Sequence, residues 1–276
     1  MKKTNEINLA ALANEARMLA LDAVYTAKSG HVGGSFSIID ALTVLYFHTM
    51  RIDPGDSKNP DRDRFVLSKG HCSPALYAVL ALRGYFPKEE LKKFRSIHHH
   101  MSGHVEMNHI NGVDMSAGSL GQGLSAAVGM ALAGKLDGKD YRVYAAMGDG
   151  EIAEGQIWEA SMAAPHYKLD NLCAMVDVNG LQIDGPTDKV MSSVPLDEKF
   201  RAFGWHVIEV DGHDYEAMAK AFDEAAAVKG KPTMVLLHTV KGKGVSFMEN
   251  QVGWHGKAPS DAEFEQAMAE LKAKEV

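Results

Sequence analysis

Two apolar segments with the composition of buried β-strands lie close together in the sequence, and each ends at an oxygen-bearing side chain. Residues 141–147 are followed by Asp149 between two glycines, and residues 171–178 are followed directly by Asn179. Residues 154–165, between them, are long enough for a crossover helix of about three turns, the kind of connection that parallel strands require. The sequence therefore predicts a βαβ unit with Asp149 and Asn179 at the same edge of a sheet.

These two side chains are suited to bind a metal ion together with a phosphorylated ligand. Ligands of open parallel sheets bind beyond the carboxyl ends of the strands. Magnesium prefers carboxylate, amide, backbone and phosphate oxygens, so Asp149, Asn179 and the carbonyl of Leu181 are candidate ligands. In the alternative interpretation, the glycine-flanked aspartate only caps a turn, which is a common arrangement. The spacing of 30 residues between Asp149 and Asn179 does not decide between the two.

Helical and strand-like segments alternate along the rest of the chain. Helices are expected at residues 6–28, 36–50, 73–83, 88–94, 124–134, 196–202, 215–228 and 261–272, and further strands at 64–67, 205–210 and 233–238. The alternation predicts an α/β fold with a doubly wound, mainly parallel sheet and helices on both faces. No linker or repeat divides the sequence, so we expect a single domain over residues 1–276.

Charge and composition argue against several classes of protein. A chain of 276 residues that is 46% hydrophobic is typical of a globular protein. The net charge of −7 and the absence of a long basic run disfavour binding to nucleic acid or to an anionic membrane. No apolar run approaches membrane-spanning length and no signal-like segment opens the chain, so we predict a cytoplasmic location. Cys72 and Cys173 lie in apolar surroundings and are predicted to be buried thiols.

Histidines and glycines are concentrated in three other segments. His31 precedes a double glycine and is expected in a tight loop, and five histidines lie within residues 98–109. His100 and His104 have helical spacing, but no carboxylate or thiol follows at ligand spacing, so a zinc site is disfavoured. Residues 118–123 form a glycine-rich turn before a helix whose amino terminus favours an anionic group. Such a turn is weak evidence by itself.

Seven segments of the chain resemble the amino-terminal half of transketolase in sequence, order and approximate spacing. They are SGHVGGSFS, RFVLSKGHCSPALYAVLALRGYF, SGHVEMNHINGVDMSAGSLGQG, GDGEIAEGQIWEA, DVNGLQIDG, VDGHD and GWHGKAP. A generic α/β scaffold would not produce seven such matches in order. The chain is therefore similar to the amino-terminal, diphosphate-binding part of the transketolase family, and the matches cover most of it.

The resemblance implies a thiamine diphosphate site with a metal ion. Asp149, Asn179 and the carbonyl of Leu181 match the family's ligands to Mg²⁺, or to Ca²⁺ or Mn²⁺ in its place. Gly150 matches a position at the diphosphate. The other residues implied to contact the cofactor are Gly118, Ser119 and Leu120, beside the aminopyrimidine, with Glu151, His71 and His255.

The resemblance also implies catalytic roles for four histidines. His71 and His255 match histidines near the diphosphate and the thiazolium ring, whereas His31 and His104 match histidines that hydrogen-bond the sugar and assist proton transfer. The cofactor performs the carbon–carbon chemistry, and the protein supplies orientation and acid/base groups. Family members often have proline directly after the histidines that match His31 and His104. This chain has valine at both places, so both loops are expected to be more mobile.

Two further implications concern a partner chain. Glu154 and Glu159 match glutamates that the family buries at its dimer interface, where carboxylates share protons between two active sites. The alternative is that they are simply acidic residues at the start of a helix. Transketolases normally continue into a pyrimidine-binding domain and a third domain, whereas this chain ends at Val276. We therefore expect those domains on a separate carboxyl-terminal subunit, with two copies of each chain.

The favoured function is that of a subunit for two-carbon ketol transfer from a ketose phosphate to an aldose phosphate. One alternative keeps the cofactor and changes the reaction, giving a relative of 1-deoxyxylulose-5-phosphate synthase or a ketolase for an unusual sugar. A second alternative is a non-catalytic diphosphate-binding subunit. The presence of both His31 and His104 favours transfer between sugars, and the complete set of metal and histidine positions argues against a non-catalytic role. The sequence does not identify the donor or the acceptor.

Overall fold

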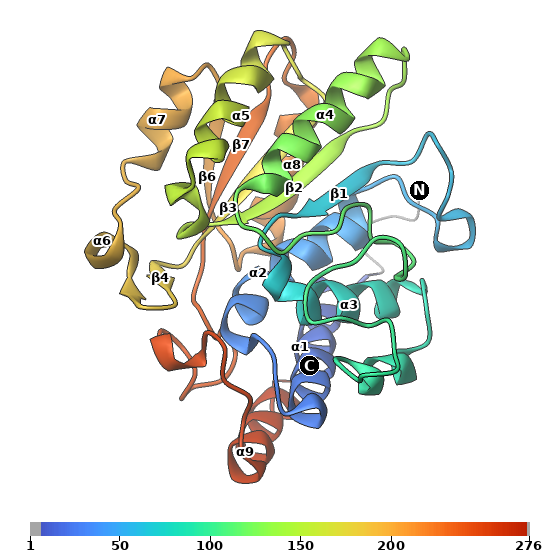
Figure 1. The fold of residues 1–276 in the computed structure, drawn as a ribbon, viewed down its shortest axis with the longest axis vertical. Helices are drawn as coiled ribbons and strands as arrows, with labels where there is room; N and C mark the ends of the chain where they lie inside the picture. The colour runs from blue at the N-terminus through green and yellow to red at the C-terminus, as the bar shows by residue number, and fades with distance from the viewer. Residues whose placement is uncertain (1–6, 275–276) are drawn as a thin grey trace.

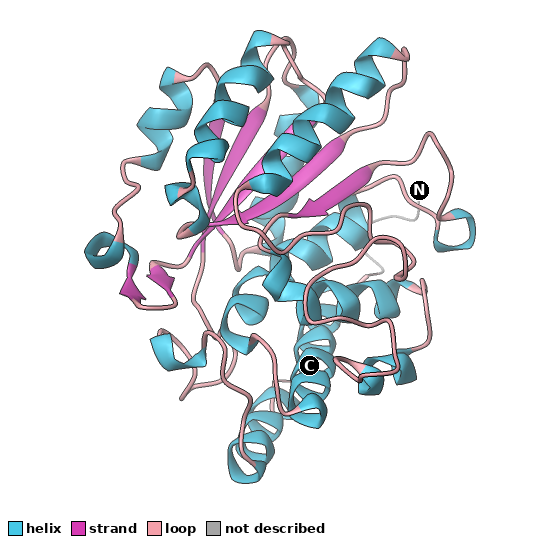
Figure 2. Cartoon of the chain, viewed as in Figure 1, coloured by secondary structure: helices cyan, strands magenta, loops and turns pink. Residues whose placement is uncertain are grey.

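A computed structural model describes residues 7–274 and contains a five-stranded parallel sheet (Figures 1 and 2). In spatial order the strands are β1 (Arg64–Leu67), β2 (Val143–Gly148), β3 (Leu172–Val178), β7 (Thr233–His238) and β6 (His206–Asp211). Every neighbouring pair in this sheet is parallel. The predicted α/β architecture is therefore confirmed, and the strand carboxyl ends all lie at one edge.

Helices cover both faces of the sheet and bury it between two hydrophobic cores. The first core includes α1 (Leu9–Ala27), α2 (Val32–Val44), α3 (Ser73–Arg83), α8 (Tyr215–Ala227) and α9 (Asp261–Lys272). The second includes α4 (Gln122–Leu136), α5 (Gly155–His166) and α7 (Leu196–Ala202). Alternate residues of β2 point to opposite faces, so Tyr144 belongs to the first core and Ala145 to the second. Burial on both faces is typical of parallel sheets and explains the continuous apolar runs.

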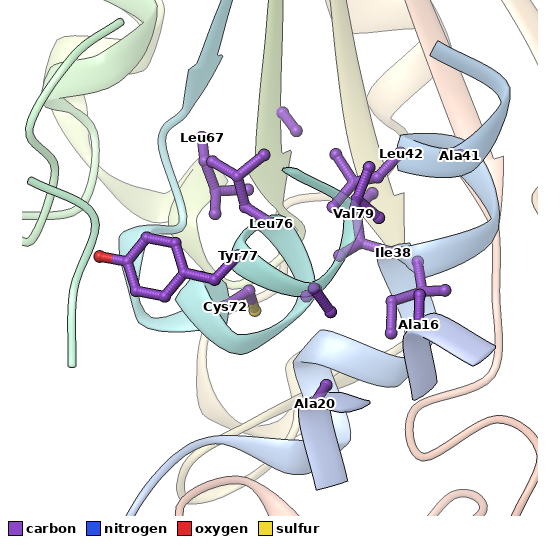
Figure 3. Close-up of a cluster of buried hydrophobic side chains, with 14 of the residues drawn as sticks. Ala16, Ala20, Ile38, Ala41, Leu42, Leu67, Cys72, Leu76, Tyr77 and Val79 are labelled. Carbon is purple, nitrogen blue, oxygen red and sulfur yellow. The ribbon is translucent and has the colours of Figure 1, made fainter. Parts of the chain in front are cut away.

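Small side chains bring α1, α2 and α3 close together. Ala16 and Ala20 of α1 lie in the same buried cluster as Ile38 and Leu42 of α2, with Val79 of α3 beside them (Figure 3). Alanines leave room for neighbouring helices to approach closely. This packing fixes the short connection between α1 and α2, and therefore His31, relative to the sheet.

The helix after His31 begins earlier than expected. The sequence predicted a tight loop and a helix from residue 36, but α2 begins at Val32 and His31 is its N-cap residue. The glycines of the expected loop lie in the first turn of α2. A β-carbon on Gly33 would lie 2.9 Å from the carbonyl oxygen of Trp254, so this glycine permits close packing rather than a turn.

Other differences concern short elements that hydrophobic periodicity does not reveal. A hairpin of two-residue strands, β4 (Leu181–Gln182) and β5 (Gly185–Pro186), and the single turn α6 (Thr187–Val190) were not predicted. The predicted helix at residues 88–94 is a 3₁₀ helix. The 3₁₀ segments are Pro54–Asp56, Gly70–Cys72, Lys88–Lys93, Glu151–Ala153 and Val252–Trp254, and a π-helical turn at Leu45–Thr49 extends α2. Glu6, where the first helix was expected to begin, lies outside the described residues.

Two smaller predictions concern the thiols and membrane spans. Cys72 and Cys173 are both buried free thiols, which confirms their predicted state. Within residues 7–274, no helix has both the length and the apolar character that a membrane span requires.

Candidate active site

The carboxyl ends of neighbouring strands converge on a cavity of about 340 Å³. Asp149 follows β2 and Asn179 follows β3, and the parallel register places Gly148 opposite Asp177. The Oδ2 atom of Asp149 accepts a hydrogen bond of 2.6 Å from the amide of Gly180. The prediction that Asp149 and Asn179 end adjacent strands at one edge is confirmed.

Asp149 lies in an environment that favours a bound cation. Burial raises the pKa of its carboxyl group to about 6, with the nearby charge of Asp177 as the second cause. A cation beside Asp149 would offset both effects. The amide oxygen of Asn179 accepts a hydrogen bond of 3.1 Å from the amide of Leu181, which fixes that side chain on the same edge. Carboxylate, amide and carbonyl oxygens thus gather at the place where the sequence predicted a metal ion.

A buried ion pair that the sequence did not predict lies below this edge. Lys69, directly after β1, pairs with Asp177 of β3, and both side chains are at most 2% exposed. Burial is the largest single influence on Lys69 and acts to lower its pKa, but the charge of Asp177, the hydrogen bond to it and smaller contributions from Cys72 and Asp149 together hold that pKa above its usual range. Asp177 also accepts hydrogen bonds from the hydroxyl groups of Ser37 and Thr239. One carboxylate therefore connects α2, β1 and the segment after β7.

Removal of this lysine is expected to destabilise the fold. Lys69→Met would leave Asp177 buried without its ion-pair partner, and we expect the free energy of unfolding to fall by about 3 kcal/mol or more. Urea denaturation monitored by circular dichroism measures this change. Lys93→Met is the matched control, because its pair with Glu90 lies at the surface, where solvent screens the charges, and its loss should change stability far less. Equal losses in the two variants would contradict the structural role of the buried pair.

A second lysine lines the same cavity. The Nζ atom of Lys241 donates a hydrogen bond of 3.1 Å to the carbonyl oxygen of Leu181 and lies 3.1 Å from Nδ1 of His255. Burial lowers the pKa of Lys241, and the charge of Lys69 lowers it further. The carbonyl of Leu181 thus points into the cavity and accepts a hydrogen bond there, and its role as a metal ligand stays a prediction.

The chemistry of the cavity fits a diphosphate with a metal ion. Lys69, Lys241 and Gln182 all line it, and the side-chain nitrogen of Gln182 is buried without a hydrogen-bond partner among the described residues. Two ammonium groups and a free amide donor suit phosphate oxygens, whereas the carboxylate of Asp149 suits a divalent cation. Gly150, also in the lining, packs closely against Gln182, because a β-carbon there would lie 2.9 Å from Cβ of Gln182, an atom that the backbone holds in place.

The four histidines named from the sequence come together beside this cavity. The ring centre of His31 lies 5.2 Å from that of His71, 6.0 Å from that of His104 and 5.6 Å from that of His255. The rings of His71 and His255 stack with centres 5.2 Å apart. These residues come from four separate segments of the chain, so only the fold could show that they form one cluster.

All four imidazoles are held in the neutral form. Burial is the main cause for each of them: it lowers the pKa of His31 to about 4 and that of His255 to about 3. Burial lowers the pKa of His71 as well, and the pKa of the more exposed His104 is lowered by partial burial and by the charge of Arg95. A neutral imidazole offers one donor and one acceptor. Nδ1 of His31 is buried without a hydrogen-bond partner among residues 7–274, so it is free to interact with a ligand.

Glu151, which was predicted to contact the cofactor, accepts hydrogen bonds from three separate segments of the protein. Its side chain lines the cavity but accepts hydrogen bonds from the hydroxyl of Ser68, the amide of Gly121 at 2.9 Å and the amide of Gly148 at 3.1 Å. Burial raises the pKa of this carboxyl group. Both carboxylate oxygens are therefore used to connect β1, β2 and the turn before α4.

The remaining predicted residues lie around the rim. Leu120 lines the cavity, and Gly118 faces His104, since a β-carbon on Gly118 would lie 3.8 Å from the imidazole ring. Ser119 is exposed between them. Glu154, the N-cap residue of α5, lines the mouth of the cavity, and Glu159 is exposed on the same helix. Burial of the two glutamates at an interface stays a prediction.

The adjacent histidines at positions 98–100 lie outside this cluster. His99 pairs with Glu90 and stacks on His100. Within the described part of the chain, no group of three or more His, Cys, Asp or Glu side chains is arranged to hold a metal ion.

Comparison with protein families gives one match that spans nearly the whole chain. The family described as "Transketolase, thiamine diphosphate binding domain" matches residues 9–274. A 6-deoxy-6-sulfo-D-fructose transketolase subunit from Clostridium sp. (strain MSTE9) is 48% identical over 267 residues, which cover 97% of both chains. An apulose-4-phosphate transketolase subunit from Phocaeicola vulgatus is 45% identical over 92% of this chain and 90% of its own.

Longer relatives and solved structures show the same similarity over part of their length. Transketolase from Rattus norvegicus is 44% identical over 94% of this chain but only 41% of its own. The solved structure of transketolase from Leishmania mexicana superimposes with a TM-score of 0.91 at 35% identity. That of the Pichia stipitis enzyme in complex with sedoheptulose-7-phosphate gives 0.91 at 36%. This chain spans about two fifths of both of these proteins.

Proposed function

Because this chain belongs to the transketolase family, matching its thiamine diphosphate binding domain over residues 9–274, we propose that it is the amino-terminal subunit of a two-chain transketolase. The proposed reaction moves a two-carbon ketol unit from a ketose phosphate to an aldose phosphate. The observation that carries the proposal is the convergence of four neutral histidines on a cavity lined by Asp149, Lys69 and Lys241. This combination suits a diphosphate cofactor at one end and a polyhydroxylated substrate at the other.

We assign the cofactor contacts to the strand ends. Asp149, Asn179 and the Leu181 carbonyl would hold Mg²⁺, while Lys69 and Lys241 would neutralise the diphosphate. Gly118, Ser119 and Leu120 would flank the aminopyrimidine. When bound, thiamine diphosphate supplies the chemistry that makes and breaks the carbon–carbon bond. The protein's part is to orient the substrate, exclude water and move protons.

Proton transfer is assigned to the histidines at the far side of the cluster. His31 and His104 would accept hydrogen bonds from sugar hydroxyl groups and take up and return their protons, because neutral imidazoles can do both. Nδ1 of His31, buried without a partner among the described residues, is the atom that we assign to this role. His71 and His255, stacked on each other beside Lys241, lie nearer the phosphate-binding end.

Removal of either substrate-facing histidine is expected to affect turnover and to spare the cofactor. His31→Ala and His104→Ala should each lower kcat by about tenfold or more, the scale of one lost acid/base group. Thiamine diphosphate affinity should stay near that of the wild type, because neither residue lines the phosphate-binding cavity. Steady-state kinetics and titration calorimetry measure the two effects separately. Unchanged turnover in both variants would exclude the assigned roles.

An exposed apolar rim supports the proposal of a second chain. Ile183, Met191 and Val194 are 60% to 65% exposed, and the first two line the cavity itself. Large apolar side chains around the mouth of a site favour contact with a protein surface. We propose that a carboxyl-terminal subunit covers this rim, and that Glu154 and Glu159 on α5 lie at an interface in an assembly of two copies of each chain.

The names of two relatives favour a second candidate function. The subunits from Clostridium sp. and Phocaeicola vulgatus are named for 6-deoxy-6-sulfo-D-fructose and apulose-4-phosphate, which are unusual sugars. A ketolase for such a sugar would use the same cavity and histidines. Assays of the two-chain enzyme with both ordinary and modified ketoses distinguish these substrates by their kcat/KM values.

Recovery of the natural partner tests the proposal as a whole. The tagged chain should copurify with one polypeptide, and that complex should transfer a ketol unit between sugars when thiamine diphosphate and Mg²⁺ are added. A complex that binds the cofactor and transfers nothing to any aldose would support the non-catalytic alternative instead.

A further inference from the structure

Arg95 lies between the two segments that carry His31 and His104. It follows the 3₁₀ segment Lys88–Lys93 and has a positive φ angle of 57°, which is uncommon for a residue with a side chain. Its amide donates a hydrogen bond of 2.8 Å to the carbonyl of Met101. This bond folds the chain back, so that the segment leading to His104 lies beside Arg95.

The guanidinium group contacts both segments. Its Nη1 atom donates a hydrogen bond of 2.7 Å to Oγ of Ser29, two residues before His31. It also lies directly against Gly103, the residue before His104. A β-carbon at Gly103 would lie 2.2 Å from Nε and 2.5 Å from Cζ of Arg95, so glycine is required for this contact. One side chain thus joins the two segments, although they are more than 70 residues apart in the sequence.

The positive charge of Arg95 is not balanced by an acidic neighbour. Burial lowers the pKa of this guanidinium, and no acidic group among residues 7–274 acts against that effect. Its Nε atom is buried without a hydrogen-bond partner in the same part of the chain. Arg95 is only partly buried, but keeping a guanidinium nitrogen away from water without an acceptor is still unfavourable. An unpaired nitrogen held between the segments of two histidines points to a function beyond stability.

The charge of Arg95 acts on both His31 and His104. After burial, the charge of Arg95 is the largest cause that lowers the pKa of both His31 and His104. The other groups that face His31 are the imidazoles of His71, His104 and His255 and the ammonium of Lys241. For His104, the only charged group that shifts its pKa, among the described residues, is the guanidinium of Arg95. The imidazole that contacts its ring is that of His31.

We propose that Arg95 is a positioning residue of the transfer reaction, which sets the separation of His31 and His104 and keeps both imidazoles neutral as proton acceptors. The proposal deepens the proposed function and rests on it, because the two histidines are assigned to the substrate there. Arg95 acts through these histidines, and its guanidinium supplies both the geometric link and the charge.

The first test does not depend on catalysis. We would titrate the full chain labelled with ¹³C-histidine by NMR, with His31→Ala and His104→Ala to assign the signals. In Arg95→Gln the midpoints of both histidines should move to higher pH by about one unit, the effect of one charge at short range. In Arg95→Lys they should stay near the wild type. Midpoints that do not move in Arg95→Gln would overturn the proposal, whether or not the wild type is an active transketolase.

The second test uses the complex with the partner chain. Loss of the positive charge raises an imidazole pKa, so the acidic limb of the pH profile of kcat should shift to higher pH in Arg95→Gln. Arg95→Lys should keep the wild-type limb and show only the loss from the missing guanidinium contacts. Lys92→Gln, three residues earlier and exposed, is the control for loss of one positive charge. Equal pH profiles for Arg95→Gln and Lys92→Gln would show that Arg95 is merely structural.

Discussion

Replacement of Asp149 by alanine is expected to abolish metal-dependent binding of thiamine diphosphate. The proposed metal ion would lose its only carboxylate ligand, and the opposing amide of Gly180 would lose its acceptor. Mutation of a residue that hydrogen-bonds a metal ligand commonly lowers metal affinity by up to about 100-fold, so loss of the ligand itself should lower it at least as much. Titration calorimetry of the chain with cofactor and Mg²⁺ measures this loss.

Two further variants separate this effect from general destabilisation. Asp149→Asn keeps an acceptor for Gly180 and removes the charge, so it should fold normally and still bind cofactor poorly. Glu216→Ala removes an equally charged but exposed carboxylate on α8 and should bind the cofactor as the wild type does. Wild-type affinity in both Asp149 variants would refute the assigned metal site.

The second large effect concerns the isolated chain. We expect the purified protein to show no ketol transfer with thiamine diphosphate, Mg²⁺ and pentose phosphates, and the partner chain to restore it by at least about 100-fold. That factor corresponds to one electrostatic contact in a site from which water is excluded. Here Ile183 and Met191 line the cavity and are 65% and 60% exposed, so water has access to it.

A coupled assay and analytical ultracentrifugation of the same samples test this expectation together. Transfer activity should appear only in the fractions that contain both chains. Ile183→Asp would place a charge in the exposed rim, and it should weaken the association while leaving the isolated chain folded. Robust transfer by the purified chain at every concentration would show that no partner completes the site.

The fold was predictable because its central strands, β2, β3 and β7, are apolar and buried on both faces. β2 and β3 alternate between two cores, so each is a continuous apolar run in the sequence, and the glycines and asparagine after them mark where they end. The hairpin β4–β5 has strands of two residues each, which are too short for any periodicity. The start of α2 was placed too late, because the glycines after His31 suggested a turn. Instead, Gly33 packs against the backbone of Trp254, more than 200 residues away, and Gly34 packs against the thiol of Cys72.

The site was predictable only where its residues belong to recognisable segments. His31, His71, His104 and His255 were predicted to belong to one site, and the structure places them within one cluster, while their catalytic roles stay predictions. Lys69 and Lys241 were missed because a lone lysine in a sequence is normally an exposed charge. Asp177 was missed because it lies inside an apolar strand, where a carboxylate is stable only if an ion-pair partner from another part of the chain is present. Pairings between distant segments are properties of the fold, and no local pattern encodes them.

The connections made by Glu151 and Asp177 have a consequence for how such a protein can diversify. These two buried carboxylates connect the ends of β1, β2 and β3. The strand ends, where the cofactor is proposed to bind, are therefore held in place by the sheet. The residues assigned to the sugar lie on separate segments outside the sheet. We therefore expect mutations in those segments to alter which sugar is accepted without weakening cofactor binding. A laboratory library aimed at new acceptors should vary positions 96–102 and leave Arg95, Gly103, His104 and the strand ends unchanged.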